Sequence, residues 1–68
     1  MRVTNHAQER MLERNIRALD VAHVLTYGKR YENKHDNTKY TFIDTQLNVY
    51  VVTDKAMSTV ITVFRKER

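Results

Sequence analysis

The sequence predicts an α+β fold in which two N-terminal helices pack on one face of a four-stranded antiparallel sheet. Apolar residues recur at helical spacing before Gly28 and alternate after it. The connections after Gly28 are a few residues long, which suits hairpins and leaves no room for helical crossovers. A chain of 68 residues can build one core, so residues 1–68 are expected to form a single domain.

The first helix is expected over residues 6–14. Ala7 and Met11 are four residues apart, which places them on the same side of a helix that turns by about 100° per residue. Thr4 or Asn5 precedes this pattern, and both residue types cap helix N-termini well. The sequence therefore predicts a short helix with one apolar side and a cap at its start.

The second helix is expected from Ala18 to Tyr27. Asn15 separates it from the first helix, since Asn tolerates the left-handed conformation in which many helices end. Gly28, the one glycine of the chain, directly follows the periodic segment and marks its end. The broad apolar side of this helix is expected to contain Leu19, Val21, Ala22, Val24 and Leu25.

Four strands are expected after Gly28, over residues 30–32, 39–43, 47–52 and 58–64. The third strand is expected to place Leu47, Val49 and Val51 on one face. The last strand is expected to place Ile61 and Val63 on one face and Val60, Thr62 and Phe64 on the other. Both helices must then cover the same face of the sheet to bury their apolar sides.

The composition is that of a globular domain, with 41% hydrophobic and 29% charged residues. The absence of Cys excludes disulfides and thiolate metal sites. No apolar run approaches the roughly 20 residues that cross a bilayer, and the N-terminus lacks a signal-peptide pattern. We therefore expect a cytoplasmic protein that does not enter a membrane. Its small size and an exposed patch of Tyr50, Val52 and Phe64 would suit a homodimer.

A formal net charge of +4 favours an anionic partner. Basic residues gather near both ends of the chain, and they would form one basic surface if those ends met. The alternative, with equal weight, is a solvated surface on which acidic residues balance the basic ones. The basic residues concerned are Arg2, Arg10, Arg14, Arg17, Arg65, Lys66 and Arg68.

No metal or cofactor is expected from the motifs. His6, His23 and His35 do not have metal-ligand spacing, and one glycine cannot build a phosphate-binding loop. Ser58, the one serine, lacks the partners of a nucleophilic triad.

One segment carries a family resemblance: His6-Ala7-x-x-Arg10-Met11-x-x-Arg14-Asn15-Ile16. Together with Asp20-Val21, Gly28 and the ending Val60-Ile61-Thr62-Val63-Phe64, it resembles the DUF4258 family of small bacterial and phage proteins. The resemblance covers nearly the whole chain and implies a relation to the barnase, EndoU, colicin and RelE-like fold. Members of that fold are largely metal-independent ribonucleases and toxins. The resemblance therefore implies an RNA substrate and an antitoxin or another protein partner.

Metal-free RNA cleavage needs a base for the 2′-hydroxyl proton, cations for the phosphate and an acid for the leaving oxygen. His6 is the candidate base or acid, because imidazole titrates near neutral pH. Arg10 and Arg14 follow at intervals of four and can present planar donors to a phosphate. Thr62 of the last strand is the fourth candidate catalytic residue.

A second group of residues is expected to bind RNA. Tyr31 and Tyr50 can stack on bases or donate hydrogen bonds, as aromatic side chains do in many RNA complexes. Arg17, Arg65 and Lys66 add positive charge.

Simpler roles are equally open for these residues. His6 can be an ordinary first-turn residue, Arg10 and Arg14 can pair with neighbouring acids, and the tyrosines can form the rim of a small core. Three hypotheses follow: a metal-independent endoribonuclease of toxin or phage-effector type, a non-catalytic nucleic-acid-binding module, and a protein-interaction domain. Toxicity on expression separates the first from the others, and salt-dependent RNA binding separates the second from the third.

Overall fold

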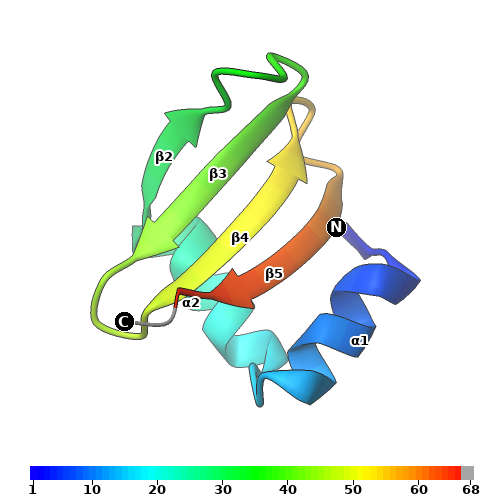
Figure 1. The fold of residues 1–68 in the computed structure, drawn as a ribbon, viewed down its shortest axis with the longest axis vertical. Coiled ribbons are helices and arrows are strands. Elements are labelled where there is room, and N and C mark those ends of the chain that lie inside the picture. Colours follow the sequence, from blue (N-terminus) through cyan, green and yellow to red (C-terminus); the bar gives the residue numbers. More distant parts are fainter. Residues whose placement is uncertain (67–68) are drawn as a thin grey trace.

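The computed structural model describes residues 1–66 and confirms the α+β class with two helices (Figure 1). The elements are β1 (Arg2–Val3), α1 (Asn5–Glu13), α2 (Ala18–Tyr27), β2 (Lys29–Glu32), β3 (Lys39–Asp44), β4 (Val49–Asp54) and β5 (Thr59–Arg65). The strands form one sheet in the order β1-β5-β4-β3-β2. Helix α2 lies behind β3 and β4 in Figure 1, and α1 lies beside β5.

The sheet differs from the prediction because it is five-stranded and mixed. Strand β1 pairs in parallel with β5, with Arg2 opposite Thr59 and Val3 opposite Val60. The other pairs are antiparallel, as expected. The sequence did not predict β1 because two residues are too few to show an alternation of apolar and polar side chains. Its partner, β5, also lies at the other end of the sequence. The four-stranded antiparallel prediction was therefore wrong in this detail.

The predicted caps of α1 are present. Thr4 is the N-cap: its Oγ1 accepts a hydrogen bond from the Ala7 backbone N–H (3.0 Å). The same hydroxyl donates to the Ile61 carbonyl of β5 (2.8 Å), so the cap also attaches α1 to the sheet. Asn15 has φ 54°, the left-handed conformation expected after the helix.

Gly28 ends α2 as predicted, although not through a left-handed conformation, since its φ is −69°. The requirement for glycine is steric. A Cβ atom at this position would lie 2.4 Å from the Val24 carbonyl oxygen and 3.0 Å from that of Ile43. Gly28 therefore permits a close approach between the end of α2 and the end of β3.

The core lies between the two helices and one face of the sheet. From the helices it contains Ala7, Val21 and Val24, and from the sheet mainly Phe42, Val49, Val51, Val60 and Val63. Leu19 and Ala22 depart from the expected apolar side of α2: Leu19 is 75% exposed, and Ala22 is exposed as well. Strand β4 starts at Val49, later than predicted, because the preceding turn includes Leu47 and a left-handed Asn48.

A β-bulge changes the face to which Val60 belongs. Val52 pairs with Thr62, but Thr53 pairs with Val60, so Ile61 is an extra residue in β5. Val60 therefore joins the core and is 1% exposed. The prediction that Val60 shares a face with Thr62 and Phe64 was wrong, because one extra residue reverses the alternation beyond it.

Candidate nucleic-acid interface

His6 and Arg10 lie on one side of α1, next to the side that carries Ala7, and Arg14 is the C-cap residue that follows the helix. His6 and Arg14 are exposed. Arg10 Nη1 lies 2.7 Å from Glu13 Oε2, in a solvent-exposed ion pair of the kind worth a few tenths of a kcal/mol. A helix is therefore present from Asn5 to Glu13, where the spacing predicts one, and Arg10 has a carboxylate partner there.

Thr62 lies on the other side of the sheet. Helix α1 packs on β5 through the face that carries Val60 and Val63. Thr62 precedes Val63 and pairs with Val52, so it belongs to the opposite face. The structure therefore does not bring Thr62 together with His6, Arg10 and Arg14.

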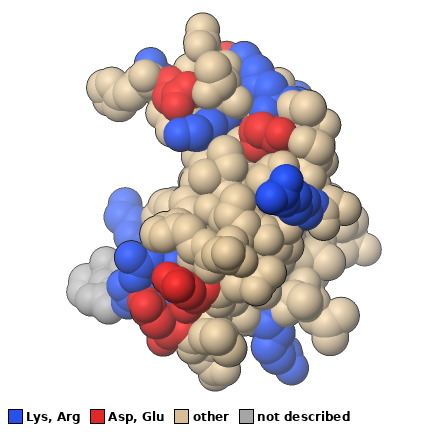
Figure 2. All heavy atoms as spheres, turned by 90° about the vertical axis from the view of Figure 1, so that its right-hand side faces the viewer, with Lys and Arg blue, Asp and Glu red and all other residues tan. Residues whose placement is uncertain are grey.

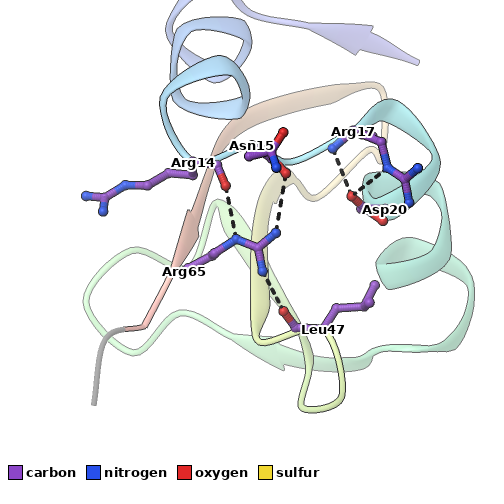
Figure 3. Close-up of polar contacts among 6 residues, drawn as sticks. All are labelled: Arg14, Asn15, Arg17, Asp20, Leu47 and Arg65. Atoms are coloured by element: carbon purple, nitrogen blue, oxygen red, sulfur yellow. Dashed lines mark hydrogen bonds and ion pairs between the residues drawn. The ribbon is translucent and has the colours of Figure 1, made fainter.

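Arg65 has a structural role that the sequence did not indicate (Figure 3). Its guanidinium donates from Nε to the Arg14 carbonyl (3.1 Å), from Nη1 to the Leu47 carbonyl (2.8 Å) and from Nη2 to the Asn15 carbonyl (3.4 Å). The Arg14 side chain points away from this cluster. Arg65 thus joins the end of α1 and the β3–β4 turn to β5.

The other two predicted cations lie at the surface. Arg17 Nε lies 3.6 Å from Asp20 Oδ2, and the Arg17 backbone N–H donates to the same oxygen (2.9 Å). This backbone hydrogen bond is the main reason that the pKa of Asp20 lies below its usual value. Lys66 is exposed, and its carbonyl accepts a hydrogen bond from Asn48 Nδ2 (2.7 Å).

Among residues 1–66, the predicted basic residues do not all lie together, and Arg68 lies outside the described residues. Arg2 pairs at the start of β5, whereas Arg65 is at its end, so these two basic positions lie far apart. Figure 2 views the molecule from the α1 side and shows separate basic groups with acidic groups beside them. Charge alone therefore does not define a binding site on this side.

The sheet face opposite the helices carries two ordered rows of side chains. The first row crosses four strands and consists of Lys29, Ile43, Tyr50 and Phe64, which are consecutive cross-strand partners. The second row consists of Tyr31, Thr41, Val52 and Thr62. Neither helix covers this face, which we call the open face (Figure 1).

The aromatic side chains of the open face are partly accessible. Tyr50 and Phe64 stack, with ring centroids 4.8 Å apart and an interplanar angle of 21°. Phe64 is 38% exposed and Tyr31 is 45% exposed, whereas Val52 is buried. Lys29 Nζ lies 5.8 Å from the centre of the Tyr31 ring. The open face thus combines accessible rings with a cation.

A pocket of about 530 Å³ lies at the corner where α2 ends, β2 begins and β3 ends. We call it the corner pocket; it is lined by His23, Tyr27, Gly28, Lys29, Tyr31, Ile43, Asp44, Thr45 and Gln46. Lys29, Tyr31 and Ile43 also belong to the open face, so the pocket is continuous with that face.

His23 and Asp44 form the polar wall of the corner pocket. His23 Nε2 lies 3.0 Å from Asp44 Oδ2. The other oxygen, Oδ1, accepts hydrogen bonds from the backbone N–H groups of Gln46 (2.9 Å) and Leu47 (3.0 Å). Asp44 is 8% exposed and is therefore a fixed acceptor that orients the imidazole.

No motif in the sequence predicted this pocket. One local signal was present, since His23 and Tyr27 are four residues apart on α2, and their rings lie 4.9 Å apart in the structure. The contact with Asp44 depends on how α2 packs on β3, which no local pattern reveals.

The family model of DUF4258, a domain of unknown function, matches residues 3–65 of the chain. The chain belongs to the DUF4258 family. The DUF4258 match extends from β1 to the end of β5 and thus includes both helices, the open face and the corner pocket. The searches of curated proteins and of solved structures found no match.

Two further properties of this DUF4258 domain concern residues 1–66. Neither helix has the length and apolar character needed to cross a membrane. In the same range, no three His, Asp or Glu side chains are grouped so that they could hold a metal ion.

Proposed function

We propose that this DUF4258 protein binds single-stranded RNA across the open face of its sheet. The observation that supports this function is the pair of cross-strand rows, in which Tyr31, Tyr50 and Phe64 are combined with Lys29. Uncovered sheets with accessible aromatic side chains bind unpaired bases by stacking, and nearby cations bind the phosphates.

Stacking is the main source of affinity in this proposal. A base placed against Tyr31, or added to the stack of Tyr50 and Phe64, covers aromatic surface that is otherwise exposed to water. Such stacking contributes about 1–3 kcal/mol per base. The net charge of +4 adds a non-specific electrostatic attraction that weakens as salt rises.

The proposal is tested by fluorescence anisotropy with short labelled single-stranded RNA. Phe64→Ala is expected to weaken binding by about 5- to 160-fold, the equivalent of about 1–3 kcal/mol. Leu19→Ala is the matched control, since Leu19 is an exposed apolar residue on α2, on the covered side of the sheet. Equal affinities of the two variants, or binding that does not depend on salt, would contradict the proposal. Binding to a protein partner in place of RNA would favour an interaction domain.

Metal-independent cleavage of the bound RNA is a second candidate function. It is favoured by the exposure of His6 at the start of α1, with Arg10 one turn further along the helix and Arg14 at its C-cap. The proposed relation to ribonuclease toxins gives the same expectation, including an antitoxin as partner. In this function His6 would exchange the proton, and the arginines would bind the phosphate.

Cleavage is tested by incubating labelled RNA with the protein in EDTA and identifying the product ends. The ribonuclease hypothesis predicts 2′,3′-cyclic phosphate ends from the unmodified protein and none from His6→Ala. Toxicity on expression that His6→Ala removes would support the same function. Binding without any product would leave the open face as an RNA-binding surface alone.

A further inference from the structure

The corner pocket has the size and the lining of a site for a small planar molecule. Its volume of about 530 Å³ falls within the range of about 300–1,000 Å³ that is usual for small-molecule sites. Two elements contribute aromatic rings to it: Tyr27 from α2 is 75% exposed and Tyr31 from β2 is 45% exposed. A large exposed tyrosine next to a concave polar surface is a ready stacking partner.

We infer that the corner pocket binds one nucleobase of the RNA strand that lies on the open face. This inference rests on the proposed RNA-binding function and extends it to base preference. Stacking on Tyr27 would hold the plane of the base. The polar groups of the pocket would contact its edge.

The polar wall is suited to reading a base edge because its groups are fixed. His23 Nε2 lies 3.0 Å from Asp44 Oδ2, so Nδ1 is the ring nitrogen that is left to contact a base edge. The side chains of Thr45 and Gln46 add further donors and acceptors from the β3–β4 turn. The buried Asp44 carboxylate also accepts hydrogen bonds from the backbone of this turn. It therefore fixes the position of the turn as well as that of the His23 ring.

Lys29 connects the pocket to the open face. It lines the pocket and is also the first member of the row that continues through Ile43 to Tyr50. An RNA strand bound along this row would thus place one nucleotide at the corner pocket, with Lys29 near the phosphate of that nucleotide. The chemistry of the lining favours a heterocycle with a phosphate attached over a purely apolar ligand.

The test compares the affinities of four short homopolymeric RNAs, one for each base, for the unmodified protein and for variants of Tyr27. The unmodified protein is expected to bind one homopolymer at least about fivefold more tightly than the others, the effect of one hydrogen bond to a matching base edge. Tyr27→Ala should remove this preference, and Tyr27→Phe, which keeps the ring, should retain it. Phe64→Ala should weaken the binding of all four RNAs alike.

The outcomes distinguish a failure of the base-pocket inference from a failure of the proposed RNA-binding function. Equal binding of the four RNAs by the unmodified protein, or a preference that persists in Tyr27→Ala, would overturn the base pocket and leave the RNA-binding surface intact. If no RNA binds, the proposed function fails. In that case, titration with nucleoside monophosphates, monitored through the NMR signals of the His23 and Tyr27 rings, shows whether the corner pocket binds a nucleotide. Shifts of both rings would support a nucleotide site, and their absence would overturn it.

Discussion

The Nε atom of Arg65 donates a hydrogen bond to the Arg14 carbonyl oxygen at 3.1 Å, and this contact joins the last strand to the end of the first helix. The carbonyl groups at a helix C-terminus lack partners within the helix. A cation placed there satisfies them and also interacts favourably with the helix dipole. The same guanidinium binds the Leu47 carbonyl, so one side chain holds three segments together.

Replacing Arg65 should therefore lower stability more than replacing its neighbour. Arg65→Ala is expected to cost about 2–3 kcal/mol in the free energy of unfolding, because hydrogen bonds from a charged donor are lost together. Lys66→Ala, at an exposed side chain, should change it by less than about 0.5 kcal/mol. Urea unfolding of both variants measures the difference. Similar values for the two would show that the Arg65 contacts contribute little.

Thr4 gives a second prediction, since its hydroxyl both caps α1 and binds β5. Thr4→Ala should cost about 1–2 kcal/mol through loss of the cap and of the bond to the Ile61 carbonyl. Thr4→Ser keeps the hydroxyl and should recover most of this loss. The check is thermal unfolding of both variants, and equal destabilisation by Ala and Ser would argue against the role of the hydroxyl.

Gly28→Ala should destabilise the fold although α2 itself would tolerate alanine. The new Cβ atom would lie 2.4 Å from the Val24 carbonyl oxygen, which is part of the backbone and cannot rotate away. The expected cost is about 1–3 kcal/mol, as for other overpacked sites. Ala22→Ser, at an exposed position on the same helix, is the control and should be nearly neutral. Chemical unfolding should therefore separate these two variants clearly.

The pH dependence of stability should include a contribution from Asp36. Hydrogen bonds from the Thr38 hydroxyl and backbone, and then from Lys39, lower the pKa of Asp36 from 3.8 to about 2. Because the folded state favours the ionised form, this contribution is complete above pH 3.8 and is lost as the pH falls through about 2.

The measurement is the melting temperature of the unmodified protein and of Asp36→Asn from neutral pH down to about pH 2. The two proteins should differ most near neutral pH and converge at the acidic end, since the unmodified carboxyl is then protonated. His35→Ala provides a control in the same loop. A difference that stays constant over the whole range would contradict the predicted role of the ionised carboxylate.

Local signals predicted much of the fold. Thr4, Asn15 and Gly28 are residue types that favour helix ends, and their positions marked the ends of both helices to within one residue. Strand β1 and the bulge at Ile61 depend on the pairing of distant segments, and local alternation does not contain that information. For this reason the predictions failed at the edge of the sheet and at Val60.

The candidate site shows the same division. The spacing of His6 and Arg10 predicted a helix that is present, because helical geometry is local, whereas Arg14 follows the last residue of that helix. The placement of Thr62 on the opposite sheet face and the contact between His23 and Asp44 both follow from tertiary packing. The catalytic role of His6 and the RNA-binding roles of Tyr31 and Tyr50 stay predictions, which the experiments above test.

The pairing of the first strand with the last has a consequence for biosynthesis. Strand β1 and helix α1 both pack against β5, whose residues are among the last that the ribosome adds to this segment. The N-terminal residues therefore lack their partner until β5 has been synthesised. Folding of this domain should be completed only after β5 has left the ribosomal exit tunnel, and until then α1 is available to chaperones or to proteases.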